Sequence, residues 1–217
     1  VDAAVMECRR AITQLGFKAI FLRPNPPKPD LYYHRPIFDP LWREVQSLGI
    51  PVGFHEGSGS NLPTVGEDRF GNSEWSLQHT SSHPMEQMLA LSATTLGGVL
   101  ERFPRLKMAY LEGNGSWLPW WLWRLDEHAE GYPETGLTMR PSDYFYRQGY
   151  VSLEADEAPG IAAIEACGAD CFVFSTDYPH SDAKYPYAIE IFLETFPVGE
   201  ENRRKILWDN CARLYGF

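Results

Sequence analysis

Short runs of apolar residues recur along the chain, and four of them follow a segment with the apolar spacing of an amphipathic helix. Each run is almost wholly apolar and does not alternate, which is typical of strands buried on both faces of a parallel sheet. The runs are residues 18–22, 51–55, 106–111, 149–153 and 171–175. Gly16, Gly49 and Gly168 lie where three of the preceding helices would end. We therefore predict an α/β fold with a parallel sheet and right-handed crossovers.

The segments between the strands are predicted to be helices. Asp39 is a plausible N-cap and Pro40 a suitable first helical residue. The helices are expected at 39–48, 82–103, 117–129, 159–166, 185–196 and 199–214. Pro84 would place His83 at the entrance of the second of these. The strand-to-helix loops (23–38 and 56–81) are long, and long loops at one edge of a parallel sheet are where such folds carry their chemistry.

Composition and charge narrow the classes of partner. The chain has 217 residues, 29 acidic and 19 basic, for a net charge of −10, with 44% hydrophobic residues. The acidic balance argues against nucleic acid or an anionic membrane surface as the main partner, and no uncharged run is long enough to cross a bilayer. The four cysteines include no CxxC pair, so we expect reduced thiols and a cytoplasmic location. No linker divides residues 1–217, which predicts a single domain.

Polar residues follow all five predicted strands, at the point where each strand ends. They are Arg23 and Asn25, His55 and Glu56, Glu112 and Asn114, Glu154 and Asp156, and Asp177 and His180. Because the carboxyl ends of parallel strands meet at one edge of a sheet, these side chains are expected to converge on a ligand site.

His55 and Asp177 are the strongest candidates for chemistry. His55 follows an apolar strand in PVGFHEG, and imidazole is the commonest metal ligand. Asp177 in FVFSTDYPH could be a metal ligand or a general acid–base group. The alternatives are a hydrogen-bonded structural histidine and an Asx-turn aspartate. His180 is a weaker candidate, because loop histidines are often simply exposed.

Three further features allow two interpretations each. Glu112 precedes Gly-Asn-Gly, which matches no phosphate-binding signature and could be turn chemistry alone. His79 and His83 are four residues apart, so on one helical turn they could contact a metal or substrate. The four tryptophans at 117, 120, 121 and 123 have helical spacing, which favours core packing over a substrate site.

Several segments together resemble a known family. They are FLRPNP, DPLWREVQSLGIPVGFHEG, HPMEQMLALSATTLGGVLERFPRLKMAYLEGNGSWLPWWLWRLDEH, FVFSTDYPHSD and RRKILWDNCARLYGF. In this order, from Val1 to Phe217, they resemble the amidohydrolase-related (amidohydrolase 2) family of the metal-dependent amidohydrolase superfamily. That branch includes aminocarboxymuconate-semialdehyde decarboxylase and resorcylate-type decarboxylases. The resemblance implies a (β/α)8 TIM barrel with a divalent metal, zinc or manganese, at its C-terminal mouth.

Carried over by position, the resemblance makes His55 the metal-binding histidine of barrel strand five. Asp177 becomes the metal-binding and proton-transferring aspartate of strand eight. Glu112 stands where the family's decarboxylases have a catalytic histidine at the end of strand six. The chain contains no HxH or ExH pair of the kind found on strand one. We therefore expect a partial barrel with strands four to eight, in which strands one to three and two metal ligands lie upstream of Val1.

The leading functional hypothesis is a metal-dependent hydrolase, in which metal-activated water attacks a carbonyl-type centre and Asp177 and Glu112 are catalytic. The alternative is a non-oxidative decarboxylase, in which Asp177 protonates the carbon that loses CO₂. In both cases the partner is a small organic molecule, such as a carboxylic acid that Arg23 could orient. Further substrate-binding candidates are Asn25, Glu56, His83 and His180.

Two hypotheses from other classes stay open. One is a non-catalytic barrel-derived piece that binds a ligand. The other is a complete doubly wound sheet, against which the missing Gly-rich phosphate loop counts. The sequence leaves a homo-oligomer open as well, because the edge strands of a partial barrel would be unpaired.

Overall fold

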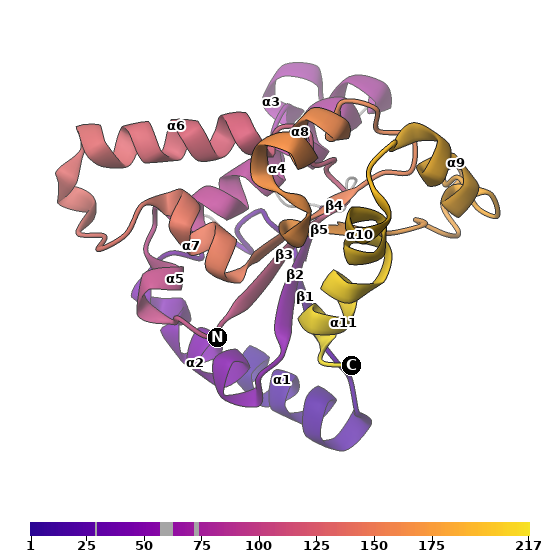
Figure 1. The fold of residues 1–217 in the computed structure, drawn as a ribbon. Helices are drawn as coiled ribbons and strands as arrows, with labels where there is room; N and C mark the ends of the chain where they lie inside the picture. The colour runs from indigo at the N-terminus through magenta and orange to yellow at the C-terminus, as the bar shows by residue number, and fades with distance from the viewer. Residues whose placement is uncertain (29, 57–62, 72–73) are drawn as a thin grey trace.

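Five parallel strands form one sheet whose spatial order, β1-β2-β3-β4-β5, is also the order along the chain (Figure 1). The computed structural model describes residues 1–28, 30–56, 63–71 and 74–217. The strands are β1 (Ile20–Leu22), β2 (Pro51–His55), β3 (Lys107–Leu111), β4 (Gly149–Leu153) and β5 (Phe172–Phe174). All five predicted strands are present, and each neighbouring pair is parallel. The predicted α/β class is therefore confirmed.

Eleven α-helices surround this sheet in the described residues. They are α1 (Asp2–Leu15), α2 (Asp39–Leu48), α3 (Glu67–Phe70), α4 (Trp75–Thr94), α5 (Val99–Arg102), α6 (Leu118–Gly131), α7 (Pro141–Gln148), α8 (Gly160–Cys167), α9 (Ala188–Thr195), α10 (Glu200–Arg204) and α11 (Asn210–Tyr215). Short 3₁₀ turns cover Pro36–Phe38, Pro133–Thr135 and Ala169–Cys171. A π-helical segment, Lys205–Asp209, joins α10 to α11, so the predicted final helix contains a local widening.

The predicted helix at 82–103 is wrong at its start and in its continuity. Helix α4 begins at Trp75 and has Pro84 in its interior, so His83 lies in the middle of the helix and not at its entrance. The first half of α4 is held by its buried side chains Gln78, Ser82 and His83, and this packing outweighs the local cost of proline. The helix then ends, and Gly98, with a φ of 76°, precedes the separate helix α5.

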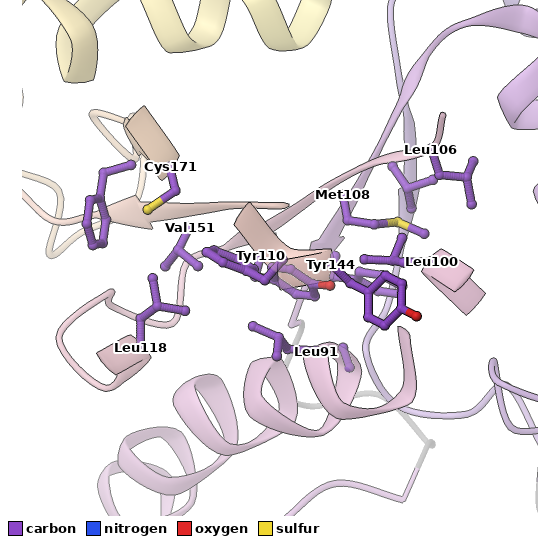
Figure 2. Close-up of a cluster of buried hydrophobic side chains, with 14 of the residues drawn as sticks. Leu91, Leu100, Leu106, Met108, Tyr110, Leu118, Tyr144, Val151 and Cys171 are labelled. Atoms are coloured by element: carbon purple, nitrogen blue, oxygen red, sulfur yellow. The ribbon is translucent and has the colours of Figure 1, made fainter. Parts of the chain in front are cut away.

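The two faces of the sheet are covered differently. The outer face, which includes Val52, Met108 and Val151, packs against helices α2 and α4–α9 in one large core. Figure 2 shows Met108 and Tyr110 beside Leu91 in that core. On the inner face, Ala109, Tyr150 and Val173 are covered by Leu214 of α11. In Figure 1, α11 accordingly lies on the opposite side of the strands from α7.

The tryptophans of α6 divide between core and surface. Trp117 and Trp121 pack against the large core, as the helical spacing predicted. Trp120 and Trp123 are 53% and 58% exposed, so the prediction of core packing is wrong for these two residues. The spacing alone could not separate them, because α6 is covered on one side only.

Two sequence expectations about cysteines and membranes can be compared with the structure. All four cysteines are free thiols. Among the described residues, none of the helices has the length and apolar character needed to cross a membrane.

Helix α4 is attached to the ends of β2 and β3 by one buried amide. Gln87 Nε2 donates to the carbonyl oxygens of Phe54 (3.1 Å) and Leu111 (2.7 Å). The helix comes so close that a Cβ on Gly113 would lie 2.7 Å from Gln87 Cγ. Since Phe54 and Leu111 directly precede His55 and Glu112, this contact positions the ends of both strands.

We predict that Gln87→Met lowers the free energy of unfolding by about 3 kcal/mol, because two buried carbonyls lose their donor while side-chain length is kept. Urea unfolding measures the change. Gln14→Met, on the exposed side of α1, is the matched control and should change stability by less than about 0.5 kcal/mol. Equal effects of the two substitutions would show that the amide does not hold the strand ends.

Candidate metal and catalytic site

A cavity of 630 Å³ opens at the carboxyl end of the sheet, where the sequence predicted the site. It is lined by Phe21, Arg23, His55, Glu56, Trp75, His79, His83, Glu112, His180, Ser181 and Asp182, and we call it the mouth cavity. A neighbouring cavity of 340 Å³ shares four of these residues and adds Glu154, Asp156 and Asp177. The structure therefore gathers polar residues from the ends of all five strands in one region.

Glu112 and Asp177 have unusual backbone conformations. Their φ angles are 53° and 55°, in the left-handed region that side chains other than glycine rarely occupy. Glu112 N–H donates to Ser152 Oγ (3.0 Å), and Asp177 N–H donates to Ser175 Oγ (3.2 Å). Such conformations cluster at functional sites, where surrounding contacts maintain them. Here they occur at the two carboxylates that follow β3 and β5.

The two carboxylates meet one imidazole. Glu112, Asp177 and His180 each offer a ligand atom within 4.8 Å of the others, and they form the one such group found in the described part of the chain. His180 Nδ1 lies 2.8 Å from Asp177 Oδ1 and 3.5 Å from Glu112 Oε1. Two carboxylates and an imidazole are a donor set that suits a divalent cation.

His55 joins this group through Glu112. Its Nε2 lies 2.7 Å from Glu112 Oε2, and its Nδ1 donates to the backbone carbonyl of Glu56 at 2.7 Å. Because Nδ1 carries a proton for the carbonyl, Nε2 donates to the carboxylate when the ring is an imidazolium. The hydrogen bond to Glu112 accordingly raises the pKa of His55, although burial opposes it.

The carboxyl groups of the site have divergent acidities. Burial tends to raise the pKa of Glu112, but the hydrogen bond and charge of His55 lower it overall. Burial, followed by the charge of Glu112, raises the pKa of Asp177. Burial and the charge of Asp177 raise the pKa of Glu154 to about 7. A site with one carboxyl held ionised and another able to hold a proton near neutrality is suited to proton transfer.

Helix α4 contributes three aromatic rings to the mouth cavity, spaced four residues apart. The ring centroids of Trp75 and His79 are 5.3 Å apart, and those of His79 and His83 are 3.9 Å apart and stacked. Burial and the neighbouring His79 lower the pKa of His83 to about 4, which keeps its imidazole neutral. The sequence pointed to the two histidines, but it missed Trp75, whose signal was the same four-residue spacing.

Asn25 is not brought to the mouth cavity. Its side chain is buried, and Nδ2 donates to Pro63 O (3.2 Å) and Thr64 Oγ1 (3.1 Å), so it fixes the chain at residues 63–64.

Glu157 is a buried residue that the sequence interpretation missed. Its carboxylate accepts hydrogen bonds from the N–H groups of Gly115, Ser116 and Glu154, and thereby joins the loops after β3 and β4.

Comparison with known proteins identifies the family. The pattern of the amidohydrolase family matches residues 1–217. The chain belongs to the amidohydrolase family. It is 28% identical over 224 residues to the γ-resorcylate decarboxylase of Polaromonas sp. strain JS666, a match that covers 99% of this chain and 66% of that enzyme.

Solved amidohydrolase structures agree with this fold. The 2,6-dihydroxybenzoate decarboxylase from Rhizobium superimposes with a TM-score of 0.81 at 28% identity, over 99% of this chain and 67% of that chain. A dihydroxybenzoic acid decarboxylase from Polaromonas sp. JS666, with bound manganese and 2-nitroresorcinol, has the same fold (TM-score 0.76, 23% identity, 99% and 65% covered). The expected partial (β/α)8 barrel of this amidohydrolase is confirmed, since the chain spans about two thirds of these relatives.

We predict that Glu112→Gln lowers the pKa of His55 in the metal-free amidohydrolase, because the largest contribution raising it is removed. An NMR titration of the His55 Cε1–H resonance measures this pKa. Asp177→Asn should lower it less, because the charge of Asp177 is the smallest of the contributions.

The sign of the accompanying stability change follows from linkage. A raised pKa means that His55 stabilises the fold fully below its unfolded value of about 6.5, and that this contribution is lost as pH rises through the folded value. As the pH rises from the unfolded to the folded pKa of His55, the free energy of unfolding of the wild type should therefore fall more than that of Glu112→Gln. An unchanged His55 pKa in Glu112→Gln would contradict the role given to the carboxylate.

Proposed function

We propose that the intact protein is a metal-dependent decarboxylase of small aromatic carboxylic acids. The observation that carries the proposal is the group of Glu112, Asp177 and His180 at the strand ends, in cavities that also hold Arg23. The similarity to γ-resorcylate and 2,6-dihydroxybenzoate decarboxylases supports decarboxylation over the hydrolysis that the sequence interpretation put first.

The donor set fits a divalent cation. Glu112, Asp177 and His180 would hold it, with His55 as a further donor after release of its hydrogen bond to Glu112. Carboxylate oxygens with imidazole nitrogens suit both zinc and manganese. When bound, the cation supplies positive charge for the substrate's carboxylate or an adjacent hydroxyl.

The mouth cavity has groups to orient an aromatic acid. The guanidinium of Arg23 can pair with a carboxylate through two parallel hydrogen bonds. Phe21 and Trp75, which are 59% and 55% exposed, offer apolar surface to a ring. The neutral imidazole of His83 can donate one hydrogen bond to an oxygen of the substrate.

Asp177 is the proposed proton donor. As the bond between the ring carbon and the carboxylate breaks and CO₂ leaves, the protonated carboxyl of Asp177 gives its proton to that carbon. His180, whose Nδ1 lies 2.8 Å from Asp177 Oδ1, then returns a proton from solvent. Before a cation binds, Glu112 positions the imidazoles of His55 and His180, and with the cation present it would serve as one of the ligands.

We predict that the intact protein, loaded with zinc or manganese, releases CO₂ from at least one member of a panel of hydroxybenzoates that includes 2,6-dihydroxybenzoate. Asp177→Asn should lower kcat by about 100-fold or more, because it removes the proton donor. Asp209→Asn is the control, since Asp209 pairs with Arg204 on the surface and should leave kcat unchanged. Hydrolysis of esters or lactones without CO₂ release under either metal would favour the hydrolase.

We further predict that the intact protein retains about one equivalent of zinc or manganese after dialysis. His180→Ala should weaken metal binding by about 10-fold or more, since one of the few ligands is lost. Metal content by plasma mass spectrometry and competition with a chelator measures the change. His128→Ala, at a partly exposed histidine on α6, is the control and should bind metal as the wild type does. Equal affinities of the two variants would remove His180 from the metal site.

A further inference from the structure

A separate cavity of 470 Å³ lies between the chain after β1 and helix α4, and we call it the side cavity. It shares none of its lining residues with the mouth cavity. Its walls are mostly apolar, with Pro24, Pro26, Leu89 and Leu96 among them. Such a volume, with apolar walls and few polar groups, is typical of a small-molecule site.

Tyr33 is one of the residues that line this cavity, and its ring is held firmly by neighbouring rings. The ring is 6% exposed and is in contact with the rings of Phe38 (5.0 Å), Trp42 (6.1 Å) and Phe54 (5.6 Å). Trp42 Nε1 also donates to the Tyr33 carbonyl at 3.1 Å. The hydroxyl makes no hydrogen bond to any residue that the structure describes. The hydroxyl is not among the fully buried atoms that lack a partner, so water or a ligand can reach it and form a hydrogen bond with it.

Glu86 supplies a second polar group to the side cavity. Its side chain is 4% exposed, and Oε1 accepts a hydrogen bond from Val65 N–H at 2.7 Å. Oε2 has no such partner within the described ranges. Burial raises the pKa of Glu86 to about 7, so near neutrality this carboxyl can either donate or accept a hydrogen bond.

The walls of the side cavity are preformed. Arg102 Nη2 donates to His34 O (3.0 Å) and to Asp39 Oδ1 (3.0 Å), which fixes the end of the loop after β1. On the other wall, a Cβ on Gly97 would lie 2.6 Å from His34 Cβ, so the loop and the turn after α4 are in direct contact there. Ligand binding would therefore cost little conformational entropy, because these walls are already ordered.

We propose that the side cavity binds a small monocyclic phenol, whose hydroxyl pairs with the Tyr33 hydroxyl and with Glu86 Oε2. A hydrocarbon of the same size would displace water from both groups and leave them unpaired, which is costly. A carboxylic acid would place its charge beside that of Glu86. The site is independent of the reaction proposed for the mouth cavity.

Phenol itself is the probe for the test, with toluene as its match without a hydroxyl. The intact protein is labelled with 5-fluorotryptophan and observed by ¹⁹F NMR. Trp42 reports on the side cavity because its indole N–H donates a hydrogen bond to the carbonyl of Tyr33. Trp75 lines the mouth cavity and reports on it. We expect a saturable shift of Trp42 with phenol, and affinity for toluene lower by about fivefold or more.

Tyr33→Phe and Glu86→Gln should each weaken phenol binding by about fivefold or more and leave toluene binding unchanged, because each alters one polar partner. Tyr32→Phe is the matched control, since Tyr32 lines the same cavity but is 40% exposed, and it should bind phenol as the wild type does. Tyr33→Phe removes an oxygen without a protein partner, so it should fold normally, and thermal unfolding verifies this.

The proposal is overturned if phenol shifts Trp75 alone, if phenol and toluene bind equally, or if Tyr33→Phe and Glu86→Gln both leave the affinity for phenol unchanged.

Discussion

The buried side-chain amide of Gln87 connects helix α4 to the strand ends that carry the site residues. Its two hydrogen bonds join α4 to Phe54 of β2 and Leu111 of β3, and the residue that follows each of them is a site residue, His55 or Glu112. The close approach also explains Gly113, where no Cβ would fit. Because α4 is held at this height on the sheet, its aromatic rings line the mouth cavity. The position of the helix and the geometry of the site are thus set by the same contact.

Glu112 is the electrostatic centre of the site. It lies between His55 and His180, and its carboxylate stabilises the protonated form of His55. The pKa of Asp177, by contrast, is raised, first by burial and then by the charge of Glu112. Both residues have left-handed backbone conformations, and they follow β3 and β5, the two neighbours of β4. A glutamate at position 112 can therefore organise two imidazoles where related decarboxylases are expected to have a histidine, which is why the departure does not exclude decarboxylation.

The two cavities differ in chemistry although α4 borders both. The mouth cavity holds Arg23 and four histidines, and it suits an anionic substrate. The side cavity is mostly apolar, with Tyr33 and Glu86 among its polar residues, and it suits a neutral hydroxyl compound. His83 lines the mouth cavity, and Glu86, three positions later in the same helix, lines the side cavity.

The amino-acid sequence was enough to predict the five strands, their parallel arrangement and the edge at which polar residues gather, because strand period and strand ends are encoded locally. It also carried the family, through motifs spread from Val1 to Phe217. The tertiary structure, by contrast, set the start of α4, since burial of Gln78 and Ser82 outweighs the tendency of Pro84 to interrupt a helix. It likewise decided that Asn25 fixes a loop, that Trp120 and Trp123 face outward, and that Glu157 joins two loops. These outcomes depend on which distant surfaces meet, and the spacing of residues along one element carries no information about its neighbours in space.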